Sequence, residues 1–230
     1  RSQSDLDTDG GEVDSENWSL QMFGSMDLIE NLYVDATLGL VQGDFEQNRV
    51  VDLTGIGSLT RQIASGSTDT QEWSASLALN YRLMLDSGWI VTPFASFLYT
   101  DIEIDEFSES GSSFDYFYPE QSFESERWSV GVRASRAINL ERGVLLPFVN
   151  LSWQHEAGLD GYSVQPSLTG TTILGPTVEV NDPDRDTGRA EVGFSFVMAS
   201  GNQFFINYSG LLFDRDGTEH AVFLGARREF

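Results

Sequence analysis

The side chains that could do acid–base or metal chemistry in this chain gather around its two histidines. His155 is followed by Glu156, and His220 follows an acidic segment, 214–219. A histidine beside carboxylates can act as a general base, and closely spaced carboxylates can bind calcium. The chain, however, has no His-Glu-x-x-His pattern, and 214–219 lacks the spacing of a calcium loop. We therefore predict no catalytic residue, no cofactor-binding site and no metal site, and interpret both histidines as residues at strand ends.

The composition excludes several classes of function. The chain of 230 residues has 13 basic residues, all of them Arg, and 36 acidic residues, which gives a net charge of −23. Such a balance repels nucleic acid, whose binding requires basic patches. The chain has no cysteine, so it has neither disulfides nor thiolate chemistry. No apolar run approaches the roughly 18 residues of a transmembrane helix, and the polar segment Arg1–Asn17 does not resemble a signal peptide.

Alternation of apolar with small or polar residues predicts strands along most of the chain. Near the end, for example, Phe194 and Phe196 flank Ser195, and a period of two residues indicates a strand. Ser-Gly-Asn at 200–202 and Asp-Gly at 216–217 predict turns. The same pattern over the whole chain predicts nine strands: Trp18–Ile29, Leu32–Asp44, Trp73–Leu83, Trp89–Ile104, Trp128–Ile138, Val144–His155, Arg189–Met198, Gln203–Leu212 and Thr218–Phe230.

The connections between these strands alternate between short and long. Turns near positions 30, 86, 141 and 200 are short, whereas we expect long loops over 53–70, 105–126 and 156–184. The short link at 214–217 is the exception to this alternation. This layout is typical of outer-membrane barrels, which have short periplasmic turns and long external loops. We interpret residues 1–16 as an acidic tail or external loop and residues 17–230 as one barrel domain.

The two faces of the predicted strands indicate that, unlike in a soluble protein, the apolar face points outward to lipid and the polar face points inward. Several strands are about as long as a tilted strand that crosses a bilayer, and aromatic residues lie at strand ends, as in an interfacial girdle. The opposite face carries charges that would make a poor soluble core but suit a wet lumen, where they can pair. The candidates for lumen-facing charges are Asp35, Arg82, Arg133, Glu191 and Arg227.

Three segments resemble one family. They are LALNYRL…SGWIVTPFASFLYTDIEIDEFSESG at 77–111, RWSVGVRASRAI…GVLLPFVNLSWQHE at 127–156, and RDTGRAEVGFSFVMASGNQFFINYSG…EHAVFLGARREF at 185–230. LYVDATLGLVQGDFEQNR at 32–49 is also similar. Together they resemble the autotransporter β-domain, the translocator of type V secretion in Gram-negative bacteria, over about residues 18–230.

The resemblance implies an antiparallel transmembrane β-barrel of twelve strands in an up-and-down order. It implies a barrel in the outer membrane, with loops at the cell surface, that translocates and anchors an N-terminal passenger domain and performs no catalysis. Phe230 would be the assembly signal read by the barrel-assembly machinery; outer-membrane lipid and lipopolysaccharide would be further partners. The predicted strands match the last nine of the twelve. We therefore expect the first strands, and the helix that usually plugs the pore, to be missing from this chain.

The direction of the predicted strands decides whether the first and last of them can pair and close a barrel. If Phe230 lies on the periplasmic side, Trp18–Ile29 and Thr218–Phe230 both run inward. Two such strands would be parallel, so we predict that they do not pair directly and that the chain does not close a barrel alone. Open edges in lipid would leave backbone groups unsatisfied.

Three other functions remain open from the residues alone. A passive outer-membrane pore would show long, stable conductance. An omptin-like outer-membrane protease would lose activity on His155→Ala or His220→Ala. A soluble β-sandwich adhesin would need no detergent.

Overall fold

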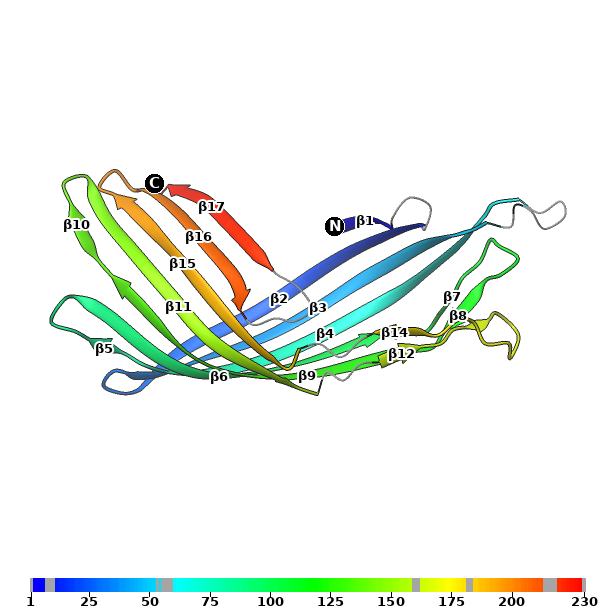
Figure 1. Ribbon diagram of the computed structural model, residues 1–230, viewed down its shortest axis with the longest axis horizontal. Helices are drawn as coiled ribbons and strands as arrows, with labels where there is room; N and C mark the ends of the chain where they lie inside the picture. Colours follow the sequence, from blue (N-terminus) through cyan, green and yellow to red (C-terminus); the bar gives the residue numbers. More distant parts are fainter. Residues whose placement is uncertain are drawn as a thin grey trace.

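The computed structural model of the chain describes residues 2–6, 11–52, 54, 60–158, 162–180, 184–212 and 219–228. All of the long strands that the structure describes belong to one antiparallel sheet whose order follows the chain, and the sheet curls into an open trough (Figure 1). No part of the described chain forms a helix that is long and apolar enough to cross a membrane. The all-β antiparallel architecture expected from the alternation is therefore confirmed.

The main sheet consists of long neighbouring strands and two short additions. In spatial order the strands are β1 (Ser2–Leu6), β2 (Gly11–Ile29), β3 (Leu32–Val51), β4 (Gln62–Tyr81), β6 (Trp89–Ile104), β9 (Gln121–Arg136), β11 (Gly143–Ala157), β15 (Asp186–Met198), β16 (Asn202–Leu212) and β17 (His220–Arg228). The additions are β5 (Leu83–Met84), which pairs with β6, and β10 (Ile138–Leu140), which pairs with β11.

Two small sheets lie in the long loops. One has the order β13 (Ser167–Leu168), β8 (Tyr116–Tyr118) and β7 (Phe107–Ser108), and the other pairs β12 (Tyr162–Val164) with β14 (Val178–Val180). At the other end of the sheet the connections are tight. The turn between β2 and β3 places Asn31 at φ 65°, a left-handed conformation that Asn tolerates better than most residues.

Two interruptions of the sheet lie at prolines. The β4–β6 ladder stops at the pair Asn80–Phe94 and resumes, as β5, at Leu83–Val91. The β9–β11 ladder stops at Ser135–Phe148 and resumes, as β10, at Ile138–Leu145. Pro93 and Pro147 lie inside these gaps, and a proline has no backbone N–H to donate to the neighbouring strand. Each proline thus separates a strand from its short continuation.

The strands at the long-loop end extend further than the sequence predicts. The expected loop over 53–70 is wrong for 62–70, which belongs to β4, and β3 continues to Val51. The expected loop over 105–126 is likewise wrong for 121–126, which belongs to β9. These extensions are rich in Ser, Thr, Gly and charged residues on both faces, so they lack the alternation that indicates a strand. Their pairing is continuous nonetheless, from Leu32–Tyr81 to Val51–Gln62.

The start of the chain also differs from the expected tail. Residues 2–6 form β1, which pairs with 11–15, so β2 begins at Gly11 rather than at Trp18. Within this segment, Glu12 and Asp14 are half-buried residues of β2 and not parts of a separate tail. Among the described residues, β17 pairs only with β16, and β2 pairs with β1 and β3. β2 and β17 do not pair, as expected, but the free side of β2 is occupied by β1, which runs antiparallel to it. The two edges of the described sheet are therefore β1 and β17.

Candidate functional site

The outer face of the sheet carries large apolar side chains that have no covering layer. Leu77 is 56% exposed and Val130 is 50% exposed, although both lie in the middle of long strands. The same face is exposed on almost every strand. Its exposed apolar residues include Trp18, Leu20, Met22, Leu38, Trp73, Leu79, Trp128, Val132, Leu151, Trp153, Val192, Phe194, Phe204, Tyr208, Val222 and Leu224. A continuous apolar band of this kind is what a membrane-spanning barrel presents to lipid.

Aromatic residues border this band toward the long-loop end. The rings of Trp73 and Tyr99 are 4.9 Å apart on neighbouring strands, and those of Phe97 and Trp128 are 4.5 Å apart. Centroid distances in this range are favourable for tilted aromatic pairs. Such a row matches the aromatic girdle found at membrane interfaces.

The inner face is polar at mid-height. Asn80 is fully buried. Its Nδ2 donates to Asp35 Oδ2 at 3.0 Å and its Oδ1 accepts from Arg133 Nη1 at 3.4 Å. The Arg133 guanidinium also lies 4.4 Å from the centre of the Phe94 ring. Two of the predicted lumen-facing charges, Asp35 and Arg133, are thus joined through an asparagine that sequence reasoning missed.

The contact between Asn80 and Arg133 also reveals which face is concave. Asn80 is on β4 and Arg133 on β9, and β6 lies between these strands. Strands in a sheet are about 4.8 Å apart, so side chains two strands apart meet most readily when the sheet curls toward them. The polar face is therefore the inside of the trough in Figure 1.

The other predicted site residues lie at different places. Arg82 lies near the short turns, 5.1 Å from the ring centre of Tyr33. Glu191 Oε1 accepts a hydrogen bond from Asn207 Nδ2 at 2.8 Å. Arg227 is opposite Gln203 in the β16–β17 ladder. The structure does not bring these three into the Asp35–Asn80–Arg133 cluster, and Phe230 lies outside the described residues.

Phenylalanines cover glycines on the inner face. A Cβ on Gly131 would lie 2.6 Å from the Phe94 ring, and one on Gly193 would lie 2.8 Å from the Phe148 ring. The ring of Phe205 covers Gly225 in the same manner. An aromatic ring over a glycine shields a weak point of the strand. The sequence signal for these contacts is a phenylalanine on one strand directly opposite a glycine on the next, and it becomes visible only once the register is known.

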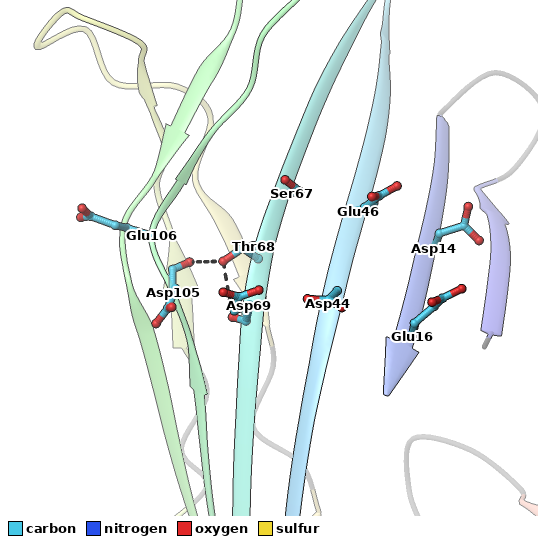
Figure 2. A pocket seen from close by; sticks show the side chains of 9 residues that line it. All are labelled: Asp14, Glu16, Asp44, Glu46, Ser67, Thr68, Asp69, Asp105 and Glu106. Atoms are coloured by element: carbon cyan, nitrogen blue, oxygen red, sulfur yellow. Dashed lines mark hydrogen bonds between the residues drawn. The ribbon is translucent and has the colours of Figure 1, made fainter. Parts of the chain in front are cut away.

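Carboxylates gather on the outer face beyond the aromatic girdle. A hollow of about 530 Å³ lies in this region, and Figure 2 shows the side chains that line it. It is lined by Asp14, Glu16, Asp44, Glu46, Ser67, Thr68, Asp69, Asp105 and Glu106. Asp44 is directly opposite both Glu16 and Asp69, and like charges opposite each other destabilise a sheet. No group of three or more potential ligands within the described ranges has the arrangement of a metal site.

The two histidines lie on different strands and have different partners. His155 Nδ1 is 2.9 Å from Asp186 Oδ1, and His220 Nδ1 is 2.7 Å from the hydroxyl of Tyr208. β15 and β16 separate the two strands that carry them. The arrangement therefore consists of two separate surface contacts and not of a common histidine site.

Comparisons with known proteins agree with this architecture. The family model described as "Autotransporter beta-domain" matches residues 1–209. The chain is 25% identical over 183 residues to the uncharacterized protein YaiT of Salmonella typhimurium, covering 74% of this chain and 17% of that protein. It is 28% identical over 137 residues to the esterase EstA of Pseudomonas aeruginosa, and this match covers 58% of this chain and 21% of EstA. The chain thus spans about a fifth of the length of these relatives.

A solved structure shares the fold. The translocator domain of the autotransporter NalP from Neisseria meningitidis superposes with a TM-score of 0.67, over 96% of this chain and 68% of that chain, at 13% identity. The apolar outer face, the polar inner face and the match of the family model over most of the sequence lead to one conclusion. The chain belongs to the autotransporter β-domain family of bacterial outer-membrane β-barrels.

Proposed function

We propose that this chain is the outer-membrane translocator and anchor for a passenger domain that precedes it in the same protein. The observation that carries the proposal is the inverted sheet, with an uncovered apolar band outside and a polar cluster at Asn80 inside. Such a sheet is stable in lipid and offers a wet interior to a passing chain. The proposal includes no catalytic step.

The open sheet requires more strands to form a pore. β1 and β17 are the two edges of the described sheet, and unpaired backbone groups in lipid cost several kcal/mol each. We propose that further strands of the same protein join β1 to β17 and complete a barrel of twelve. The five charges Asp35, Arg82, Arg133, Glu191 and Arg227 would then line its lumen.

The test is the location of the passenger in cells that make the full-length protein. We expect an external protease to remove the passenger from intact cells while the barrel domain stays in the outer-membrane fraction. Deletion of the barrel domain should leave the passenger inside the cell. A passenger that reaches the surface without this domain, or that stays in the periplasm with it, would contradict the proposal.

A second test concerns the proposed assembly signal, Phe230. If the barrel-assembly machinery reads this terminal aromatic residue, its deletion should lower insertion into the outer membrane of cells. Refolding of the same variant into detergent should remain nearly unchanged, because no machinery takes part there. Equal losses in both assays would assign Phe230 a purely structural role.

A further inference from the structure

The outer face of the sheet has an apolar groove toward the end that carries the short turns, on the left of Figure 1. The groove has a volume of about 490 Å³, within the range of about 300–1,000 Å³ that is usual for ligand pockets. Its walls come from β6, β11, β15 and β16 and include Trp89, Pro147, Val149, Val192, Phe194 and Tyr208. The groove is therefore a hollow within the apolar band and not an even part of it.

The sizes of the side chains in neighbouring strands explain the groove. Val149 is directly opposite Ala134 of β9 on one side and Val192 of β15 on the other. These three side chains are small. Large rings stand on both sides of them, Trp89 on β6 and Tyr208 on β16. A low apolar strip between taller rings has the shape that accommodates a flexible hydrocarbon chain.

An arginine lies beside the groove at the short-turn end. Arg136 is directly opposite Trp89 in the β6–β9 ladder, and it is in register with Val132 on the outer face of β9. Its Nε lies 3.7 Å from where a Cβ on Gly88 would be, so the side chain extends toward the turn before β6. Arg136 is half-buried, and within the described part of the chain it has no ion-pair or hydrogen-bond partner for its guanidinium.

An unpaired arginine is unexpected in a chain with 36 acidic and 13 basic residues. Arg127, for comparison, forms an ion pair with Glu156. An arginine on the lipid side of a barrel keeps its charged head at the membrane interface, so the counterion of Arg136 has to come from the membrane. The planar guanidinium matches the oxygens of a phosphate group, and basic sites at this depth bind anionic lipid head groups.

We propose that the groove and Arg136 form a binding site for one anionic phospholipid, with an acyl chain in the groove and the phosphate on the Arg136 guanidinium. Trp89 lies between the two, at the level where interfacial tryptophans meet the head groups. The short turns of such barrels are periplasmic, so the site is in the periplasmic leaflet. The proposal rests on the location of the barrel in the outer membrane and not on the translocation of a passenger.

The test uses the full-length protein in phosphatidylcholine vesicles that contain a small fraction of phosphatidylglycerol with brominated acyl chains. Bromine quenches the fluorescence of nearby tryptophans, and the contribution of Trp89 is the difference between the wild type and Trp89→Phe. We expect brominated phosphatidylglycerol to quench this component several-fold more than brominated phosphatidylcholine at the same mole fraction. Equal quenching by the two lipids would overturn the site.

Two variants separate the charge from the groove. Arg136→Gln should abolish the preference for phosphatidylglycerol, whereas Arg189→Gln, which removes the same charge from an exposed position in register with Glu191 on the inner face, should keep it. An unchanged preference in Arg136→Gln would overturn the phosphate contact.

Val149→Phe fills the groove without changing the charge, and it should also abolish the preferential quenching of Trp89. Val132→Phe is its control, because it adds the same ring to the outer face of β9, on a residue that does not line the groove. A preference that survives in Val149→Phe would mean that Arg136 attracts the lipid without an acyl chain in the groove, which overturns the groove as its binding site.

Heat-resistant mobility on gels verifies that each variant is folded before its fluorescence is compared. Protease removal of the passenger from intact cells is measured with the same variants. A passenger that reaches the surface normally while the wild-type protein shows no lipid preference would contradict the phospholipid site alone. A clear lipid preference in a protein that leaves its passenger in the periplasm would support the site and contradict the translocator.

Discussion

At the scale of single residues, the assignment of the two faces can be tested with two neighbours on β4. Leu77 lies in the apolar band and Ser76 on the inner face. Leu77→Arg should cost about 2–4 kcal/mol, the penalty for an arginine at the bilayer midplane, whereas Ser76→Arg should be tolerated. Urea unfolding of the full-length protein in lipid vesicles measures both. Equal costs would show that the face assigned to lipid is wrong.

The polar cluster on the inner face leads to a second residue-scale prediction. Asn80→Ala removes the hydrogen bonds to Asp35 and Arg133 and leaves both charges short of a partner. Leaving buried polar groups unsatisfied costs about 1–3 kcal/mol.

Asn150→Ala is the matched control, because Asn150 also lies on the inner face but its Oδ1 has no hydrogen-bond partner. We expect a smaller loss for it in the same unfolding experiment. If the control loses as much stability, the hydrogen bonds of Asn80 are not what stabilises the cluster.

At the scale of elements, the loop 105–120 should respond to high pH through Tyr118. Burial raises the folded-state pKa of this phenol above its unfolded value. The contribution of Tyr118 to the packing of this loop is therefore fully present below the ordinary tyrosine pKa of about 10. It is lost as the pH rises from there through the raised folded pKa. In an absorbance titration of the refolded protein, Tyr118→Phe should remove a tyrosine that ionises late.

Tyr33→Phe provides the comparison for that titration, because it removes another tyrosine, one outside the loop 105–120. It should leave the late-ionising component in place. A late component that persists unchanged in Tyr118→Phe would contradict the burial of this phenol.

The sequence predicts those elements whose two faces differ and misses those whose faces are alike. β6 is predicted with its observed bounds, Trp89–Ile104, because apolar and small residues alternate along it between a turn and a loop. In contrast, 62–70 reads as a loop, since small and polar residues stand on both of its faces. Contacts between a strand and a distant loop, such as Arg49 of β3 with Glu109, have no local pattern at all. They depend on how the loops fold onto the strands, and the alternation of apolar and polar residues in the sequence carries no information about that.

Alternation likewise cannot predict which side chains on the inner face contact each other. Alternation assigns Asp35 and Arg133 to one side of the sheet, but it does not select Asn80 as the residue that joins them. That selection follows from the β3–β4 register, in which Asp35 is opposite Ala78 and diagonal to Asn80. The order of the strands and the curl then bring Arg133 within reach.

At the scale of the whole molecule, the open edges predict that the 230 residues alone do not form a finished barrel. Refolded alone in detergent, the chain should lack the heat-resistant, compact mobility of a closed barrel on gels. A longer protein that includes the proposed further strands should show it, because only then is every edge in the lipid paired. A chain that becomes heat-resistant alone would mean that its own edges can close.

The length of the β3–β4 hairpin determines which residues of this protein are accessible to antibodies outside the cell. β4 continues from Trp73 in the girdle to Gln62, about 35 Å of strand at roughly 3.3 Å per residue. A tilt of roughly 40° makes this about 27 Å of height above the interface. An antibody that approaches an intact bacterium therefore meets this arm before it meets any residue of the apolar band. Immune selection would fall on 44–51 and 62–70, while lipid shields Leu77 and its neighbours from recognition.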